Sequence, residues 1–341
     1  MSSADKEILL TIVVPIYNVE KYLRQCLDSL VYQTVQNFNV ILVNDGSTDH
    51  SAEIAQENAG LGAARNTGLK NVNTPYVEFL DSDDWLMPSS VENILKVAKN
   101  EDDLVDIMFT TPVVYNMANK QYEDWMDKYA VESIFAQKHN TNPRNLIEMY
   151  ALEPNVNRSI WSVAFLKKYD FEFPVGVKWE DVYPHFYLFY HARSCVYVKN
   201  AGFVYRINSG GQITSMSGSA RLDIIPAFEN SLRFAFENHW NEHEIAYIIR
   251  MMESFVRWSM GMSTKPVRRA LCAKVHVLFN MIPHGYLKAY YREFGFGRAV
   301  KLYFYILRSP LFYRLLSNRH MQEIGFGCIQ KVKRLQVWRK R

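Results

Sequence analysis

The chain has 341 residues, of which 48% are hydrophobic and 22% are charged, and its formal net charge is +4. This composition is typical of a folded globular protein and excludes an intrinsically disordered one, and the length favours one large domain or two modest domains. Because the net charge is small, the distribution of charge along the chain carries more information than its size.

Neither the cysteines nor the apolar runs favour an extracellular or membrane-spanning protein. The four cysteines, at positions 26, 195, 272 and 328, are far apart and lack zinc-site spacing, which favours reduced thiols in a cytosolic protein. No apolar run reaches the roughly 18 residues of a membrane span. The run near the N-terminus is short and broken by a proline, so it does not resemble a signal peptide.

The N-terminal segment predicts a strand, a helix and a second strand. Residues 9–16 (LLTIVVPI) and 39–44 (NVILVN) are β-branched apolar runs, typical of strands buried on both faces of a parallel sheet. Between them, after a turn at Pro15 and Asn18, residues 19–31 carry apolar side chains at helical spacing. This order is typical of the opening of a nucleotide-binding βαβ unit.

An acidic turn, DGSTD at residues 45–49, follows the second predicted strand. Asp45 comes directly after the strand, where a carboxylate is well placed to accept hydrogen bonds from a base or a ribose; alternatively, it is a turn residue before Gly46. Because the sequence contains neither GxGxxG nor GxxxxGKS/T, a dinucleotide-binding fold and a P-loop ATPase are disfavoured.

Residues 56–68 (QENAGLGAARNTG) are rich in small side chains, which allow close approach of the backbone. Within them, Arg65 offers a fixed fork of donors suited to a phosphate or a carboxylate. Its alternative role is that of a helix-surface arginine paired with a neighbouring acid.

Three carboxylates follow the apolar run at residues 77–80: Asp81, Asp83 and Asp84. Acids this close repel one another unless a cation lies between them, and Mg²⁺ or Mn²⁺ takes oxygen ligands of this kind. We therefore predict an Asp-x-Asp metal site at the carboxyl end of a buried strand, where open α/β sheets bind ligands. The alternative is a polar loop in which Asp83 or Asp84 caps the next helix.

Four motifs in this order, VPIYN, NDGSTD, QENAGLGAARNTG and LDSDD, closely resemble family 2 glycosyltransferases with a GT-A fold, over roughly residues 9–215. The resemblance implies an α/β fold, with a Rossmann-like, nucleotide-binding mixed sheet flanked by helices. It also implies transfer of a sugar from a nucleotide-sugar to a hydroxyl, with inversion at the anomeric carbon.

The resemblance assigns roles to individual residues of the four motifs. It implies that Pro15 and Asn18 lie at the nucleotide edge, that Asp45 contacts the uracil or the ribose, and that Arg65 lies near the nucleotide. It places Asp81 and Asp83 at the Asp-x-Asp metal site, where Asp83 would touch the metal directly and Asp81 would lie nearer the ribose.

The segment between DGSTD and QENAG departs from the family pattern. The family usually has a longer helix and a further strand there, but only residues 50–55 separate the two motifs in this sequence. Six residues make fewer than two helical turns and leave no room for a strand. Either an edge strand is absent or a segment is missing from the sequence, and without the strand the nucleotide pocket loses one wall.

The middle of the chain contains a second acidic motif. Residues 88–99 predict an amphipathic helix, 104–114 a strand, and 117–150 insertions on the acceptor side. Glu180 and Asp181 then precede a predicted helix.

This pair resembles the Glu-Asp motif of the family, in which the second acid is the general base that a poorly nucleophilic sugar hydroxyl requires. We therefore assign the base to Asp181, with Glu180 as the alternative. Without the upstream motifs, Glu180 and Asp181 would be read as ordinary acids at the start of the predicted helix at 182–191, where the helix dipole favours negative charge.

Residues 194–200 predict a strand, and residues 202–215 resemble a flexible family segment that closes over the diphosphate. Arg206 would suit that task as a bidentate donor, and the glycines would supply mobility. The alternative is a plain surface loop.

Beyond about residue 220 the motifs end and the sequence reads as helical, so we expect a GT-A domain at 1–218 and a helical region at 219–341. The QxxRW motif of processive relatives is not matched, because Arg257 and Trp258 are present but the glutamine of the motif is not. With no membrane span either, transfer of one sugar is favoured over polymerisation.

The last part of the chain, from Leu287, is basic and aromatic. Its acids are Glu293 and Glu323, against thirteen lysines and arginines interleaved with Tyr, Phe, Trp and Leu. Such a stretch favours a peripheral position on an anionic membrane surface. The alternatives are a packed helical subdomain and a contact between copies in a homo-oligomer; nucleic acid is disfavoured, since no binding module accompanies the stretch.

Two functions follow. The first is an inverting, metal-dependent transferase that passes a hexose or N-acetylhexosamine from a UDP-sugar to a glycan acceptor. The tail favours a lipid-linked acceptor, as in capsule, exopolysaccharide or wall-polymer synthesis, at the cytoplasmic face of the membrane. The second is a catalytically weak or inactive GT-A domain that serves as a membrane-associated partner of another glycosyltransferase; the short segment after DGSTD favours it.

Overall fold

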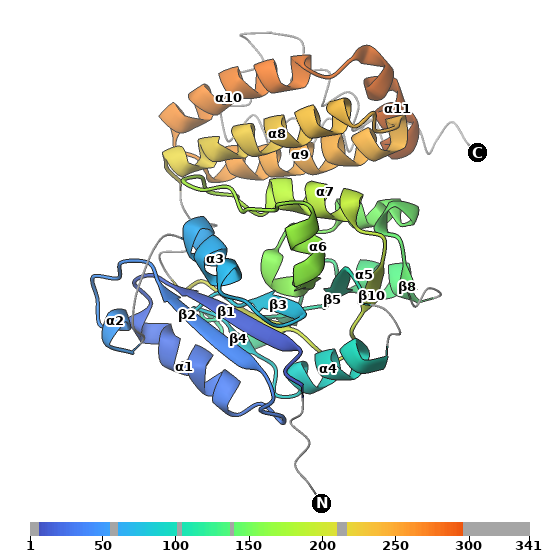
Figure 1. The fold of residues 1–341 in the computed structure, drawn as a ribbon. Helices are drawn as coiled ribbons and strands as arrows, with labels where there is room; N and C mark the ends of the chain where they lie inside the picture. Colours follow the sequence, from blue (N-terminus) through green and yellow to red (C-terminus); the bar gives the residue numbers. More distant parts are fainter. Residues whose placement is uncertain (1–6, 55–60, 101–103, 137–139, 210–216, 296–341) are drawn as a thin grey trace, which may run out of the picture. The chain divides into compact units, whose positions relative to one another are not determined.

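The structure is a computed structural model that describes residues 7–54, 61–100, 104–136, 140–209 and 217–295. The chain divides into two compact units, residues 1–212 and residues 213–341 (Figure 1). The sequence-based boundary at residues 218 and 219 stays a prediction.

A mixed sheet of seven strands forms the centre of the first unit, in the order β2-β1-β3-β9-β5-β10-β8. β1 pairs in parallel with β2 and β3, and β9 lies antiparallel between β3 and β5. The strands are β1 (Leu10–Ile16), β2 (Asn39–Asn44), β3 (Tyr76–Phe79), β5 (Ile107–Phe109), β8 (Asn140–Thr141), β9 (Ser159–Ser162) and β10 (Cys195–Tyr197). The mixed sheet flanked by helices confirms the predicted fold class.

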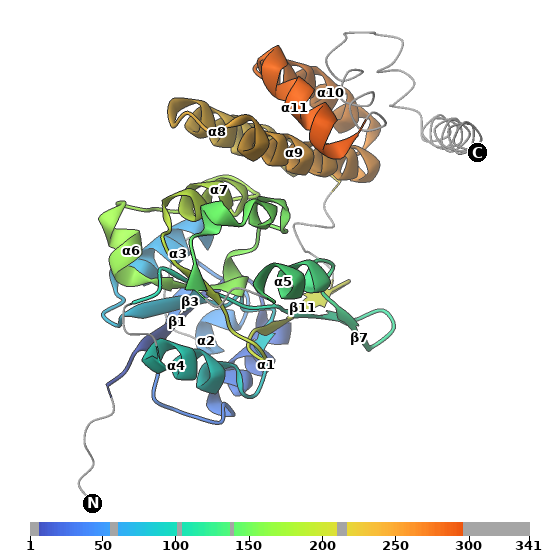
Figure 2. The same cartoon turned by 90° about the vertical axis from the view of Figure 1, so that its right-hand side faces the viewer.

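Helices cover both faces of this sheet, as the two views in Figures 1 and 2 show. α3 (Leu61–Lys70), α6 (Val163–Lys168) and α7 (Val182–His191) lie on one face. α1 (Glu20–Val31) and α4 (Ser90–Asn100) lie on the other. The predicted helices at 19–31, 88–99 and 182–191 are therefore confirmed, with small shifts at their ends.

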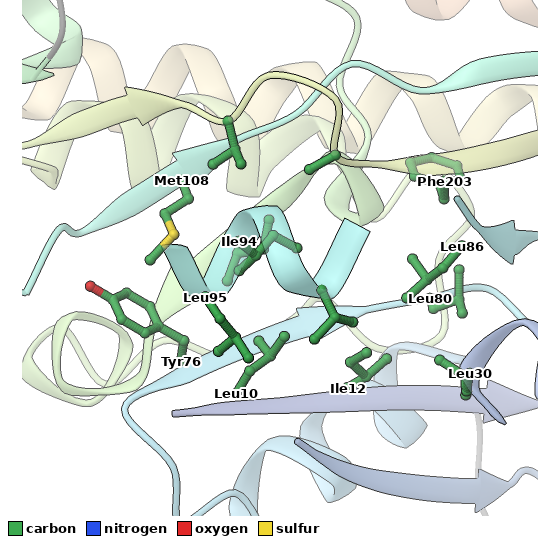
Figure 3. Close-up of a cluster of buried hydrophobic side chains, with 14 of the residues drawn as sticks. Leu10, Ile12, Leu30, Tyr76, Leu80, Leu86, Ile94, Leu95, Met108 and Phe203 are labelled. Carbon is green, nitrogen blue, oxygen red and sulfur yellow. The ribbon is translucent and has the colours of Figure 1, made fainter. Parts of the chain in front are cut away.

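Alternate residues of β1 face the two helical layers. Leu10 and Ile12 point into an apolar cluster with Leu30 of α1 and Ile94 of α4, and the members of this cluster are at most 4% exposed (Figure 3). On the opposite face, a Cβ at Gly68 would lie 2.3 Å from a methyl carbon of Val13, so only glycine lets α3 approach the sheet this closely. Gly68 of this motif thus has a packing role.

A second sheet of four strands, in the order β4-β11-β6-β7, lies in the same unit. The strands are β4 (Trp85–Leu86), β6 (Val113–Asn116), β7 (Gln121–Asp124) and β11 (Phe203–Ile207). The single strand predicted at 104–114 is wrong: β5 and β6 belong to different sheets, and Pro112 lies between them, where it cannot donate to a ladder. The loop predicted at 202–215 is also wrong in its first part, which forms β11.

Short elements complete the first unit. These are α2 (Ser51–Ile54), α5 (Lys128–Phe135) and three 3₁₀ turns at Pro143–Asn145, Ile147–Ala151 and Val156–Arg158. Among the described residues no strand lies between α2 and α3, and β2 forms an edge of the sheet. The prediction that β2 is buried on both faces is therefore wrong, since its first two residues are exposed.

The second unit is helical as far as it is described. After a 3₁₀ turn at Ser219–Asp223 come α8 (Ile224–Glu237), α9 (Glu242–Met262), α10 (Lys265–Asn280) and α11 (His284–Phe294). α9 begins with a capping box in which Asn241 and Glu244 each accept a backbone N–H of the other.

α11 contains the described start of the basic region. It buries Tyr290, and Glu242 of α9 pairs with Arg292, so this part of the region is packed within the helical unit. Residues 296–341, where most of the predicted membrane-binding surface lies, are outside the described residues. No helix in the described ranges is long and apolar enough to cross a bilayer.

Candidate active site

The predicted site residues gather where the first strands of the main sheet end. Asp45 follows β2, and Asp81 comes two residues after the end of β3. Because β1, β2 and β3 run in parallel, their carboxyl ends meet at one edge of the sheet, where α/β folds bind ligands. Asp181, far along the chain, reaches the same edge at the start of α7.

Arg65 connects the two acidic motifs. Its Nη2 donates to Asp81 Oδ1 at 2.8 Å, and its Nη1 donates to Glu180 Oε1 at 2.9 Å and to Asp181 Oδ1 at 3.3 Å. The side chain is 2% exposed. Although burial opposes its positive charge, the three carboxylates outweigh burial and raise its pKa, so Arg65 is a permanent cation at the centre of the site.

A pair of reciprocal hydrogen bonds holds the segment that leads to Glu180 and Asp181 against α3. Asn66 Nδ2 donates to the carbonyl of Phe173 at 3.0 Å, and the N–H of Phe173 donates back to Asn66 Oδ1 at 2.8 Å. The Phe173 ring lies 5.7 Å from the Arg65 guanidinium carbon. Sequence reasoning missed Asn66; its signal was a polar side chain next to Arg65 in a helix of small residues, at a position that proves buried.

Asp181, the predicted base, is partly exposed. Its Oδ2 accepts the Val156 N–H at 3.4 Å, and 24% of the side chain stays exposed. Burial raises its pKa to about 7; Arg65 opposes this shift, whereas Glu180 and Asp81 add to it. The side chain caps no N–H of α7, so it faces the site and not the helix that it precedes.

The residue before the two acids has an unusual backbone. Trp179 has a φ of 64°, in the left-handed region that a bulky aromatic residue rarely adopts. Such conformations persist where the surrounding structure enforces them, often at functional sites. Here the turn brings Glu180 and Asp181 to Arg65.

The predicted metal site lies at the end of β3. Asp83 is half-buried, and burial together with Asp81 raises its pKa to about 6. Asp84 is buried, with its Oδ1 bonded to the N–H of Arg206 at 2.8 Å, and its Oδ2 has no partner among the described residues. The helix-capping alternative is wrong, because strand β4 follows directly.

The donors here fit a hard divalent cation. They are carboxylate oxygens. Burial, and then the neighbouring carboxylates, raises the pKa values of Asp83 and Asp84, and a bound cation would favour the charged forms. In the described ranges no group of three or more His, Cys, Asp or Glu side chains is arranged to hold a metal ion. A cation held by Asp81 and Asp83 would therefore take its other ligands from substrate phosphates and water, as Mg²⁺ commonly does.

Arg206 lies in β11, and not in the loop that the sequence predicted. Its Nε donates to the carbonyl of Asp83 at 2.7 Å, and its Nη2 donates to Gln25 Oε1 at 2.8 Å. The guanidinium carbon also lies 4.7 Å from the Tyr22 ring and 4.6 Å from the Trp85 ring. In this structure Arg206 thus supports the Asp-x-Asp turn from behind.

The turns after β1 and β2 are bonded to each other. The Asn18 N–H donates to Ser47 Oγ at 3.2 Å, and Asn18 Oδ1 accepts the Thr48 N–H at 2.8 Å. Asn18 has a φ of 50°, which asparagine tolerates better than most residues. These bonds give the predicted nucleotide edge a fixed backbone.

Pro15 and Asp45 lie beside this pair of turns. Pro15 is buried within β1, where it does not turn the chain as predicted, and it pairs with Val43 of β2 beyond the last residue that β3 pairs. Asp45 is half-buried; burial raises its pKa, and Lys178 opposes the shift. Its carboxylate is therefore available at the same edge as Asp81.

A groove of about 500 Å³ lies between α1 and the four-stranded sheet. It is lined by Gln25, Asp28, Ser29, Tyr32, Trp85, Leu86, Met87, Pro88, Val113, Tyr122 and Val204. Two of these, Gln25 and Trp85, also contact Arg206, so the Arg206 side chain lies between the groove and the Asp-x-Asp turn.

Comparison with known proteins identifies the family. The sequence model of glycosyl transferase family 2 matches residues 11–172. Glycosyltransferase EpsH of Bacillus subtilis is 31% identical over 250 residues, which cover 67% of this chain and 70% of EpsH. Glycosyltransferase GlyA of Streptococcus pneumoniae is 34% identical over 224 residues, which cover 59% of this chain. The matched part spans only 31% of GlyA's own length.

Solved structures show the same fold at low sequence identity. The S. aureus TarS fragment 1–349, in complex with UDP-GlcNAc, superposes with a TM-score of 0.69 at 18% identity, and 92% of each chain is covered. This likeness confirms the GT-A type of mixed α/β fold. Together with the family match and the identity to EpsH, it shows that the chain belongs to the family 2 glycosyltransferases, enzymes that use nucleotide-sugars as donors.

Proposed function

We propose that this chain transfers one hexose or N-acetylhexosamine, with inversion, from a UDP-sugar to a hydroxyl of a glycan acceptor in the synthesis of a wall or surface polysaccharide. TarS, a structural neighbour, has been crystallised with UDP-GlcNAc and with UDP. A teichoic acid poly(glycerol phosphate) polymerase of Staphylococcus epidermidis is 36% identical over 149 residues. The TarS complexes support a UDP-sugar as the donor, and the teichoic acid polymerase supports a role in the synthesis of a wall polymer.

The observation that carries the proposal is the position of Arg65 between the two acidic motifs. Asp81 lies on the side of the predicted donor site, and Asp181 supplies a partly exposed base at the other end of the same guanidinium. A single buried cation thus fixes the distance between the part of the site that would hold the donor and the part that would deprotonate the acceptor. Catalysis by approximation requires a fixed separation of this kind.

Asp181 acts on the acceptor. An acceptor hydroxyl attacks the anomeric carbon as its proton passes to the Asp181 carboxylate, and the bond from that carbon to the β-phosphate oxygen breaks, so UDP leaves with the electron pair. A base with a pKa of about 7 combines an ionised fraction at neutral pH with adequate basicity. Glu180 is the alternative base, but its side chain is more deeply buried than that of Asp181, and its bond to Arg65 is shorter, 2.9 Å against 3.3 Å.

Asp83 and Asp81 would hold Mn²⁺ or Mg²⁺, which, when bound, neutralises negative charge on the departing diphosphate. Asp45, with the bonded turns around Asn18 and Pro15, would bind the uridine. Arg206 would act on the donor mainly by holding the backbone of the Asp83 turn.

The basic, aromatic region from Leu287 onward supports a more specific proposal for the acceptor and for where the protein acts. Its charge and aromatic residues favour a lipid-linked acceptor and peripheral contact with the anionic inner face of the cell membrane. Contact between copies in a homo-oligomer is the competing use of the same surface.

A second candidate function rests on a different observation. Among the described residues no strand pairs with the outer side of β2, where the family pattern places one. This favours a weak or inactive GT-A domain that assists another glycosyltransferase at the membrane.

The test is release of UDP from a panel of UDP-sugars with Mn²⁺, Mg²⁺ or chelator. We expect slow, metal-dependent release from one donor, loss of release in Asp83→Ala, and loss of turnover in Asp181→Asn with UDP binding intact. If the wild type, Asp83→Ala and Asp181→Asn all bind no UDP and release none under any metal condition, the result would instead favour the second function.

A further inference from the structure

A small cavity lies behind Asp181, on the side away from Arg65. It has a volume of about 10 Å³, and its lining includes Val156, Arg158, Trp161, Asp181 and His185. Asp181 Oδ1 bonds Arg65, whereas Oδ2 bonds Val156, which belongs to this lining. A space of this size suits one water molecule when two to four polar groups are present.

His185 offers an acceptor to this cavity. The ring interacts with the backbone of Tyr150 and Met149, and Nε2 has no partner among the described residues, so we assign the donating N–H to Nδ1. Burial and the charge of Arg158 lower the His185 pKa to about 3, which keeps the ring neutral. A neutral ring that donates through Nδ1 has a lone pair on Nε2.

Two donors in the same lining also have no partner in the described part of the chain. They are the indole Nε1–H of Trp161 and the Nε–H of Arg158. The other guanidinium nitrogens of Arg158 bond the Asp127 carboxylate at 2.7 and 2.8 Å, which fixes the orientation of the remaining N–H. Buried polar groups without partners are uncommon, so three around one small cavity require an explanation.

One water molecule would satisfy all of them. It would accept from Trp161 and Arg158, and it would donate to His185 Nε2 and to Asp181 Oδ2. The two donors and two acceptors on the protein match the two lone pairs and two hydrogens of a single water.

We propose that this cavity binds one water molecule and that His185, through that water, is a positioning residue for the Asp181 carboxylate. The inference rests on the proposed role of Asp181 as the base. Arg65 holds one carboxylate oxygen, and the water held by His185 fixes the other, so the carboxylate keeps a single orientation. His185 lies one helical turn after Asp181, and its N–H donates to the Asp181 carbonyl at 3.1 Å, so the two residues are rigidly linked.

Two substitutions distinguish the role of Nε2 in the His185 ring from that of Nδ1. His185→Gln places an amide group near the position of Nε2 and retains the acceptor, whereas His185→Asn can replace only the Nδ1 bond to the carbonyls and lacks the acceptor. We expect His185→Asn to lower kcat about 10- to 100-fold, since a small misplacement of a reacting group has effects of this size. We expect His185→Gln to stay within about threefold of the wild type. UDP affinity and melting temperature should match in the two variants.

Equal kcat values for the two variants, or a loss of kcat that follows the melting temperature, would overturn the role of His185. Asp181→Asn is the control for the underlying function: if it turns over normally, the assignment of the base fails whatever His185 does. A high-resolution crystal structure gives a readout that needs no activity. It should contain an ordered water within hydrogen-bonding distance of Nε2, and a dry cavity would refute the proposal.

Discussion

Strand β3 and the turn after it bury carboxylates in two contrasting ways. Glu78 is fully buried, opposite Ile12 of β1 and Ile160 of β9, which both belong to the apolar cluster. Neither of its carboxylate oxygens has a partner among the described residues. Three residues later, Asp81 is held by Arg65.

The difference shows what separates a site from a core. Burial alone raises the pKa of Glu78 to about 8, so this side chain is neutral at pH 7 and behaves as a misplaced polar group. At the site, Arg65 opposes the effect of burial on Asp181, so its pKa rises only to about 7 and part of this carboxyl group is charged at neutral pH. A carboxylate becomes useful where the fold also supplies the cation that stabilises its charged form.

Removal of Arg65 tests this contrast most strongly. Arg65→Met leaves Asp81, Glu180 and Asp181 uncompensated, so we expect loss of measurable transfer and destabilisation by about 3–5 kcal/mol at pH 7, as for other broken buried ion pairs. Denaturant unfolding and the UDP-sugar assay measure the two effects.

Arg65→Lys is the matched variant, because it keeps the charge but not the fork that reaches three carboxylates. It should fold better than Arg65→Met and remain impaired in transfer. Wild-type stability and activity in Arg65→Met would show that the three carboxylates need no cation.

Removal of Glu78 should raise the free energy of unfolding, whereas removal of Arg65 should lower it. The unfolded chain ionises Glu78 near pH 4.5, whereas the folded protein keeps it protonated up to about pH 8. Between these values the unfolded state binds fewer protons, so the free energy of unfolding falls as pH rises. We expect Glu78→Leu to stabilise the protein by about 4 kcal/mol at pH 8 and to remove this dependence.

Glu78→Gln separates titration from burial, because it removes the ionisation but keeps a buried polar group. It should remove the pH dependence with a smaller gain in stability than Glu78→Leu. A loss of stability in both variants, measured by denaturant unfolding from pH 5 to 8, would indicate that Glu78 has a partner that we have not identified.

The pH profile of transfer tests the base. Since Asp181 must be ionised to accept a proton and its pKa is about 7, kcat/KM should fall about tenfold per pH unit below pH 7. Glu180 raises this pKa, so Glu180→Gln should stay active and move the decline to lower pH. Loss of activity in Glu180→Gln with no shift of the profile would assign the base to Glu180.

Of the substitutions proposed here, Arg206→Lys should have the smallest effect on transfer. Arg206→Lys keeps the positive charge but loses the bond from Nε to the Asp83 carbonyl and the contact of the planar guanidinium with Trp85. We expect about a tenfold rise in KM for the donor with little change in kcat, because the Asp-x-Asp turn loosens while the base is unaffected. A large fall in kcat would instead show that Arg206 contacts the reacting groups.

The local elements and their order were predictable from the sequence. β-branched runs of strand length gave β1 and β2, and a helical apolar period gave α1. The acids were also predictable as a group, because they come directly after such runs and the carboxyl ends of parallel strands share an edge. These inferences need only neighbours within a few residues.

Other features required the tertiary structure. The pattern within 104–114 could not show that β5 and β6 join different sheets, nor could that of β2 show that it lies at an edge. Both depend on which strands pair, and pairing is decided by segments distant in the sequence.

The sequence by itself determined the family, the order of the elements and the two acidic motifs. Only the tertiary structure decided that Arg65 joins those motifs and reaches Glu180 across 115 residues of chain. It also decided that Arg206 supports the metal-site turn from a strand, and that Glu78 is buried without a partner among the described residues. The physical reason is that periodicity and motifs report backbone conformation and burial, which are local, whereas the partner of a buried charge is set by the packing of distant segments.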